Sequence, residues 1–182
     1  TGEVLWSSPH PAWRLAWSDN GQGLAAVFQG VILMLDAGSG RVLRRFWLQC
    51  TTLAWARSQL LVSNEGARLL VLDEGTGAPQ VSQPCQGVTD LQGARHEPWM
   101  VTCGMDRTVR LWEIGSRVRR KGGEFRPRQG SPHYLSVAPG WDEVAVMTRE
   151  GVFFVVTLPA GQRRLRVNTK DRRASVAWSP DG

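Results

Sequence analysis

Residues 103–114 read CGMDRTVRLWEI, and this stretch decides the fold. An apolar run that ends at Cys103 is followed by a turn containing Gly104 and Asp106, and then by alternating apolar and polar residues over 109–114. Glycine adopts backbone angles that other residues resist, and an aspartate side chain can accept a hydrogen bond from the backbone beyond it, so both favour a tight reversal. The stretch therefore predicts two antiparallel strands joined by a short turn.

The composition is that of a globular domain built from short strands. Of 182 residues, 42% are hydrophobic and 21% are charged, which is enough apolar material for a sizeable core. The 20 glycines and 10 prolines stand between short apolar runs, a distribution that favours many strands over a few long helices. The longest apolar runs, 31–35 and 152–156, are too short to span a bilayer, and the first residues lack a signal-peptide pattern. We therefore expect neither a membrane segment nor secretion.

Similar segments recur along the chain about every 40 residues, a period typical of repeat proteins with four strands per unit. The segments LAWS (15–18), LAWA (53–56) and VAWS (176–179) are nearly identical, and DLQG (90–93) and YLSV (134–137) occupy corresponding places between them. In the first unit the apolar segments and turns predict strands at 13–18, 24–28, 31–36 and 41–46. The expected division of the chain is an outer strand at 1–9, four units at 10–46, 47–84, 85–125 and 126–169, and a first strand at 170–182.

A unit of four antiparallel strands cannot bury both faces of its own small sheet, so each unit must stack on its neighbours. Radial stacking leaves only short, protected edges and gives a β-propeller. The tryptophans at the repeated positions are then expected in the core: Trp17, Trp55, Trp112 and Trp178.

The third unit resembles a repeat of the WD-repeat family. Thr102, Asp106 and Trp112 stand where that repeat places its second-strand hydroxyl, its turn aspartate and its third-strand tryptophan. The resemblance implies an all-β propeller of four-stranded antiparallel blades, with about four complete blades plus a partial strand at each end, forming part of a larger WD-repeat protein. It also implies a non-enzymatic scaffold for other proteins inside the cell, in the cytoplasm or the nucleus. The unit departs from the family pattern in having Gln86-Gly87 where a Gly-His pair is frequent, so we expect local backbone groups to satisfy Asp106.

No catalytic, cofactor or metal constellation is recognisable. His10, His96 and His133 lie in or beside proline-containing turns, without a nucleophile or carboxylate at relay spacing. The Gly-rich segments 38–40 and 75–77 join strands and lack the lysine and following helix of a phosphate loop. We expect no small-molecule substrate. The three cysteines, Cys50, Cys85 and Cys103, are widely spaced and odd in number, which favours buried reduced thiols and a reducing compartment.

The net charge of +6 suggests a second possible function. Eight basic and only two acidic residues occur between Arg107 and Arg128, forming a basic stripe. Arginines also recur on the predicted fourth strand of three units, which is the outermost strand of a propeller blade. Such a rim could bind an anionic polymer, either RNA or acidic protein tails such as those of tubulin, although charge also protects edge strands from self-pairing. The rim arginines are Arg41, Arg44, Arg45, Arg117, Arg119, Arg120, Arg163, Arg164 and Arg166.

The family resemblance places a partner-binding face at the turns between second and third strands and at the entrances to the first strands. An exposed methionine or tryptophan there would be a plausible anchor for a partner. The residues expected on this face are Gln29, Glu65, Met105, Asp106, Arg107, Arg149 and Glu150, with Trp13 and His133 nearer the propeller axis.

Overall fold

The computed structural model describes residues 4–8, 11–65, 67–74, 76–169, 174–179 and 181. These residues form four antiparallel sheets of four consecutive strands each, here called blades 1 to 4. Blade 1 comprises β1 (Arg14–Trp17), β2 (Gly23–Phe28), β3 (Val31–Asp36) and β4 (Val42–Trp47). Blade 2 comprises β5 (Cys50–Ala56), β6 (Gln59–Asn64), β7 (Arg68–Leu72) and β8 (Pro79–Pro84). Blade 3 comprises β9 (Val88–Gly93), β10 (Trp99–Gly104), β11 (Val109–Ile114) and β12 (Val118–Phe125). Blade 4 comprises β13 (Pro132–Val137), β14 (Glu143–Thr148), β15 (Val152–Thr157) and β16 (Arg163–Asn168).

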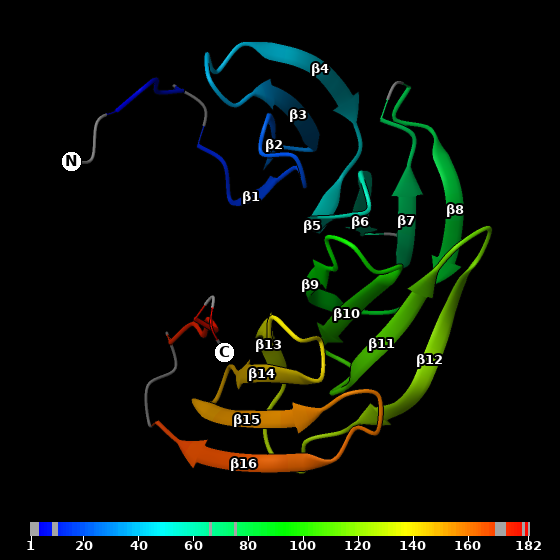
Figure 1. Ribbon diagram of the computed structural model, residues 1–182, viewed down its shortest axis with the longest axis vertical. Coiled ribbons are helices and arrows are strands. Elements are labelled where there is room, and N and C mark those ends of the chain that lie inside the picture. Colours follow the sequence, from blue (N-terminus) through cyan, green and yellow to red (C-terminus); the bar gives the residue numbers. More distant parts are fainter. Residues whose placement is uncertain are drawn as a thin grey trace.

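The blades follow one another along an arc, with the first strands β1, β5, β9 and β13 on the inside and the fourth strands on the outside (Figure 1). Blades 1 and 4 lie at the two ends of the arc, so the four blades do not close into a ring (Figure 1). This arrangement confirms the prediction of an all-β propeller with about four complete blades. The second and third strands of each blade are largely buried on both faces, while β16 is exposed throughout. The difference follows from stacking, because neighbouring blades cover the middle strands, while the second face of blade 1 is packed against Trp6 and Phe28.

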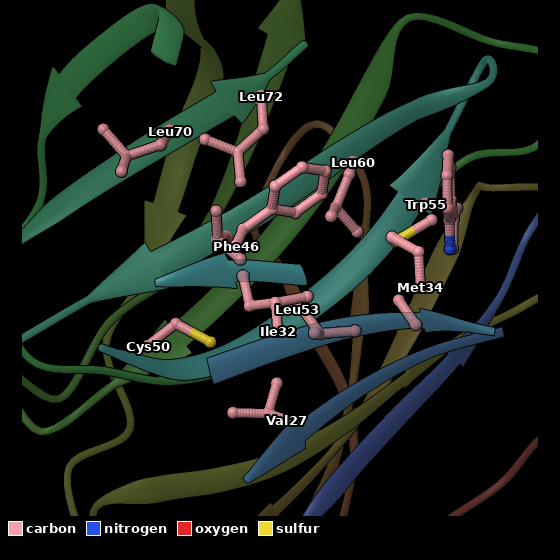
Figure 2. Packing of buried hydrophobic residues seen from close by; sticks show 12 residues of the cluster. Val27, Ile32, Met34, Phe46, Cys50, Leu53, Trp55, Leu60, Leu70 and Leu72 are labelled. Carbon is pink, nitrogen blue, oxygen red and sulfur yellow. The ribbon is translucent and has the colours of Figure 1, made fainter. Parts of the chain in front are cut away.

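Adjacent blades are held together by apolar side chains that meet between their sheets. Between blades 1 and 2, Ile32 and Phe46 from one sheet pack against Leu60 and Leu72 from the other (Figure 2). The ring of Phe46 also lies directly against Gly77, where a Cβ atom would stand 2.3 Å from Phe46 Cδ1. Similar clusters join blade 2 to blade 3 and blade 3 to blade 4. The blades therefore form one continuous body that can hold turns in fixed positions.

Several predicted strands agree with the structure, and the differences have physical causes. The strand predicted at 31–36 coincides with β3, and those predicted at 13–18, 24–28 and 41–46 differ from β1, β2 and β4 by one residue at one or both ends. The prediction that Trp17 is buried is wrong, since its side chain is 60% exposed. Trp55, in the corresponding place of blade 2, is 5% exposed because blade 1 covers it. Trp17 lies on the face of blade 1 that points into the open side of the arc.

The terminal strands remain predictions. Residues 4–8 and 174–179 contain no assigned strand. Residues 1–3, 9, 170–173, 180 and 182 of the predicted terminal segments lie outside the described residues, as does His10 of the first predicted unit. Trp6 nevertheless packs against Gly40 and donates its ring N–H to the Ala37 carbonyl at 2.9 Å. Among the residues that the structure describes, none belongs to a helix long and apolar enough to cross a membrane.

Candidate functional site

A hollow of about 450 Å³ lies where the turns between second and third strands meet the entrances of the inner strands. Four of the residues expected on the partner-binding face line it, and they come from three blades: Glu65 from blade 2, Met105 from blade 3, and His133 and Arg149 from blade 4. Blade 1 contributes Arg14. The complete lining is Arg14, Thr51, Ser63, Asn64, Glu65, Ala67, Gly87, Val88, Thr89, Met105, His133 and Arg149.

The turn of blade 3 is braced by Asp106. Its Oδ1 accepts hydrogen bonds from the Thr108 backbone N–H at 3.1 Å and from the Thr108 hydroxyl at 2.7 Å, and Oδ2 pairs with Arg110 Nη1 at 2.5 Å. Arg107 in the same turn has φ of 61°, a left-handed conformation that these bonds help to hold. The expectation that local backbone groups satisfy Asp106 holds only for the bond from the Thr108 N–H, because its other two partners are the side chains of Thr108 and Arg110. The same geometry leaves the Met105 side chain 56% exposed at the hollow.

Arg149 and His133 form the basic side of the hollow. Arg149 Nε donates a hydrogen bond to His133 Nδ1 at 3.4 Å, and this bond requires that nitrogen to be unprotonated. Burial lowers the pKa of His133, and the positive charges of Arg149 and Arg14 lower it further. The imidazole therefore acts as a neutral acceptor, while Arg149 supplies a positive charge at the edge of the hollow.

Arg14 is a site residue that the sequence interpretation missed. Its guanidinium lies 5.6 Å from the centre of the Tyr134 ring and donates to the Thr89 carbonyl at 3.1 Å. It also lies 3.8 Å from the Asp90 carboxylate, which is 14% exposed. Burial raises the pKa of Asp90, and the nearby Arg14 opposes that shift. The position of Arg14 beside Trp13 at the start of the first strand was the signal available for it.

The inner strands are joined by side chains of β9 that bond to the backbone of β13. Asp90 Oδ2 accepts from the Leu135 N–H at 3.1 Å, and Gln92 Oε1 accepts from the Val137 N–H at 2.9 Å. The Thr89 hydroxyl donates to the Pro132 carbonyl at 3.0 Å. These contacts fix blade 4 against blade 3, and so they position His133 and Arg149 relative to Met105.

The other residues predicted on this face do not line the hollow. Glu150 Oε2 accepts the Ser131 N–H at 2.8 Å and so braces the start of blade 4. Gln29 occupies a turn with φ of 43°, and Trp13 is 55% exposed on blade 1. Their side chains, like that of Arg107, are exposed away from the hollow's lining.

The arginine rim is exposed, but it is not uniformly basic. Glu124 pairs with three arginines of the stripe: Arg110 at 3.1 Å, Arg120 at 3.3 Å and Arg126 at 2.6 Å. On blade 4, Arg164 pairs with Glu143 and Arg166 contacts Gln129. The stripe therefore carries less uncompensated charge than its composition indicates. Two of the predicted rim residues, Arg41 and Arg117, immediately precede the fourth strands of their blades instead of lying on them. All the predicted rim arginines are exposed: Arg41, Arg44, Arg45, Arg117, Arg119, Arg120, Arg163, Arg164 and Arg166.

The thiols and the acidic residues show no reactive or metal-binding arrangement in the described part of the chain. Cys50, Cys85 and Cys103 are buried and unpaired. Burial raises the pKa of Cys50 to about 12 and that of Cys103 further, so both thiols stay protonated. No group of three or more His, Cys, Asp or Glu side chains is placed to hold a metal ion within the described ranges.

Comparisons with known proteins agree with the propeller fold. The family model for the WD domain, G-beta repeat (WD40), matches residues 79–113, which include most of blade 3. Similar solved structures include U3-55K, at 20% identity over 86% of this chain and 49% of that chain with a TM-score of 0.75. They also include the RRP9 WD40 repeats, at 20% identity over 86% of this chain and 49% of that chain with a TM-score of 0.74. The β-propeller domain of Cps50 (Swd1) from Myceliophteria thermophila is 14% identical over 93% of this chain and 57% of that chain, with a TM-score of 0.73.

The sequence comparison with curated proteins gives no significant match. The chain spans about half the length of the solved structures that it resembles. The segment from β8 to β11 matches the WD40 repeat model, and the fold of the chain is that of the WD40 β-propellers.

Proposed function

We propose that this chain is a non-enzymatic scaffold segment that binds other proteins through the turn face around the hollow, as part of a larger intracellular assembly protein. The observation that carries the proposal is that side chains from all four blades converge on the hollow. Their supporting turns are held by hydrogen bonds to the sheets and between the blades. A concave surface with an exposed Met105 beside fixed charges has the elements of a protein docking site, because apolar anchors supply affinity and charged groups supply orientation.

The intracellular part of the proposal rests on the cysteines. All three are buried and unpaired, which fits a compartment that keeps thiols reduced. The three thiols of the described residues are buried and the pKa of Cys50 is raised by burial, whereas an enzyme of the nucleophilic class needs an accessible, activated nucleophile. The chemistry of the face therefore favours recognition over catalysis.

A second candidate is binding of RNA or an acidic protein tail at the rim. The observation in its favour is a set of exposed arginines that form no ion pair within the described ranges: Arg45, Arg117, Arg119 and Arg163. These arginines are spread over the outer strands of three blades, whereas the hollow gathers its side chains in one place. The rim therefore fits a weak, salt-dependent contact better than a specific one.

Affinity capture with two charge-changing variants separates these functions. Met105→Asp places a charge at the exposed apolar anchor of the face, and Arg119→Glu reverses a charge on the rim. We expect the proteins captured from lysate by the unmodified chain to be lost with Met105→Asp, retained with Arg119→Glu, and unaffected by nuclease. Loss with Arg119→Glu or after nuclease treatment, with retention by Met105→Asp, would contradict the proposal and favour the rim.

A further inference from the structure

We propose that the hollow recognises an extended segment of a partner protein in which an acidic side chain stands next to an apolar one. This inference rests on the proposed function and adds the chemistry of the ligand. The acidic group lies against Arg149 and Arg14, and the apolar group lies against Met105. Each half of the recognition follows from a separate feature of the lining.

The basic half of the hollow has unused hydrogen-bonding capacity. A guanidinium has five N–H donors, and among the described residues the guanidinium of Arg149 donates one hydrogen bond, to the neutral ring of His133. No carboxylate among the described residues lies within 4.0 Å of Arg149. Arg14 adds a second positive charge, of which the Asp90 carboxylate at 3.8 Å compensates a part. A carboxylate is the group that a guanidinium binds with two parallel hydrogen bonds, so an acidic side chain satisfies this half.

The threonine hydroxyls that line the hollow already have hydrogen-bond partners within the protein, so they do not compete for a polar ligand. The Thr51 hydroxyl lies 3.2 Å from the Ser63 carbonyl and 3.3 Å from the Val88 carbonyl, and the Thr89 hydroxyl donates to Pro132. Further apolar surface comes from Ala67 and Val88. The exposed thioether of Met105 is flexible and polarisable, which suits an aliphatic or aromatic side chain. A volume of about 450 Å³ exceeds what one carboxylate fills, so the second side chain is needed to displace water.

Glu65 fixes the direction of the segment. It brings a negative charge to the hollow from blade 2, whereas Arg149 comes from blade 4. A partner carboxylate is repelled by Glu65 and attracted by Arg149, so the acidic side chain lies on the blade 4 side. The same charge disfavours a phosphate chain running through the hollow, because every phosphate carries a negative charge. A protein segment with one acidic group therefore fits better than RNA.

Selection from a library of displayed random peptides tests this inference on the full chain. We expect the enriched peptides to contain Asp or Glu within two positions of an apolar residue. These peptides should bind Arg149→Glu about tenfold more weakly than the unmodified chain, as expected for the loss of one charged hydrogen-bonded contact worth about 1.4 kcal/mol. Arg119→Glu makes the same change at an exposed rim position and should bind them unchanged. Thermal melting monitored by circular dichroism checks that both variants are folded.

Three results would overturn the inference. The first is enrichment of peptides without an acidic preference, and the second is equal weakening by Arg149→Glu and Arg119→Glu. The third is displacement of the peptides by a uridine 20-mer used at the same concentration. If peptides without acidic residues are enriched and are lost with Met105→Asp, the inference about the ligand is wrong while the face remains the binding site. If the enriched peptides respond to none of these changes on the face, both proposals fail.

Discussion

Replacing Trp112 by phenylalanine is expected to destabilise the chain by about 1–3 kcal/mol. Trp112 is 5% exposed, and its ring N–H donates to the Thr102 hydroxyl at 2.8 Å. Thr102 is 2% exposed, so water does not replace the lost donor without rearrangement. The loss of unfolding free energy has two parts: one buried hydrogen bond is lost, and the buried Thr102 hydroxyl is left without a partner. For a chain of this size each kcal/mol corresponds to a fall in melting temperature of about 2–4 °C.

A double-mutant cycle isolates the hydrogen bond from the change in ring size. Thr102→Val keeps the shape of the threonine side chain and leaves the Trp112 ring N–H without a hydrogen-bond partner. The double variant has neither the ring N–H nor the hydroxyl, so no buried polar group is left without a partner. Its loss of unfolding free energy should therefore be smaller than the sum of the two single losses by about 1 kcal/mol. Urea denaturation followed by circular dichroism measures all four proteins. Trp55→Phe serves as a control, because the Trp55 ring N–H has no hydrogen-bond partner among the described residues. A coupling below about 0.3 kcal/mol, or an equal loss with Trp55→Phe, would refute the assignment of this bond as a stabilising contact of blade 3.

Three further changes test other parts of the structure. Gly77→Ala should cost at least about 1 kcal/mol in unfolding free energy and more than Gly21→Ala, because both glycines have positive φ but only at Gly77 does a Cβ atom meet the Phe46 ring; equal losses would show that the contact is unimportant. Glu124→Gln should cost about 0.5–1.5 kcal/mol by weakening three arginine pairs, and the loss should shrink in 1 M salt in denaturant titrations. The pKa of His133 is below its ordinary value in the folded chain, so as the pH falls the unfolded chain binds a proton at this residue before the folded chain does. The stability of the fold should therefore decrease as the pH drops below about 6.5. Melting curves of His133→Gln between pH 7 and 5 should lack this part of the decrease.

The local features of the fold could be predicted because they depend on neighbours in sequence. All the partners of Asp106 lie within four residues of it, namely the N–H and the hydroxyl of Thr108 and the guanidinium of Arg110. The strand predicted at 31–36 is bounded by glycine and turn residues and coincides with β3. Such signals lie within a few residues of one another and appear directly in the sequence.

The remaining features depend on which surfaces meet, and a repeat pattern does not specify this. Trp17 and Trp55 occupy equivalent positions, but only the second has a blade packed over it. Arg110 belongs to the basic stripe in the sequence, but in the structure it forms an ion pair with Glu124 on the adjacent strand β12. The hollow itself joins Arg14 to residues that are more than 100 positions away in sequence. The contribution of Arg14 to the hollow therefore became visible only with the fold.

Site-specific photo-crosslinking tests the central claim most directly. A benzophenone amino acid placed at Met105, on the turn face, is compared with the same group placed at Arg119, on the rim, in cells or in lysate. The account predicts protein adducts from the Met105 position that persist after nuclease and in moderate salt, with few or none from the Arg119 position. Adducts confined to Arg119, whether with RNA or with an acidic protein, would contradict a partner-binding face at the hollow.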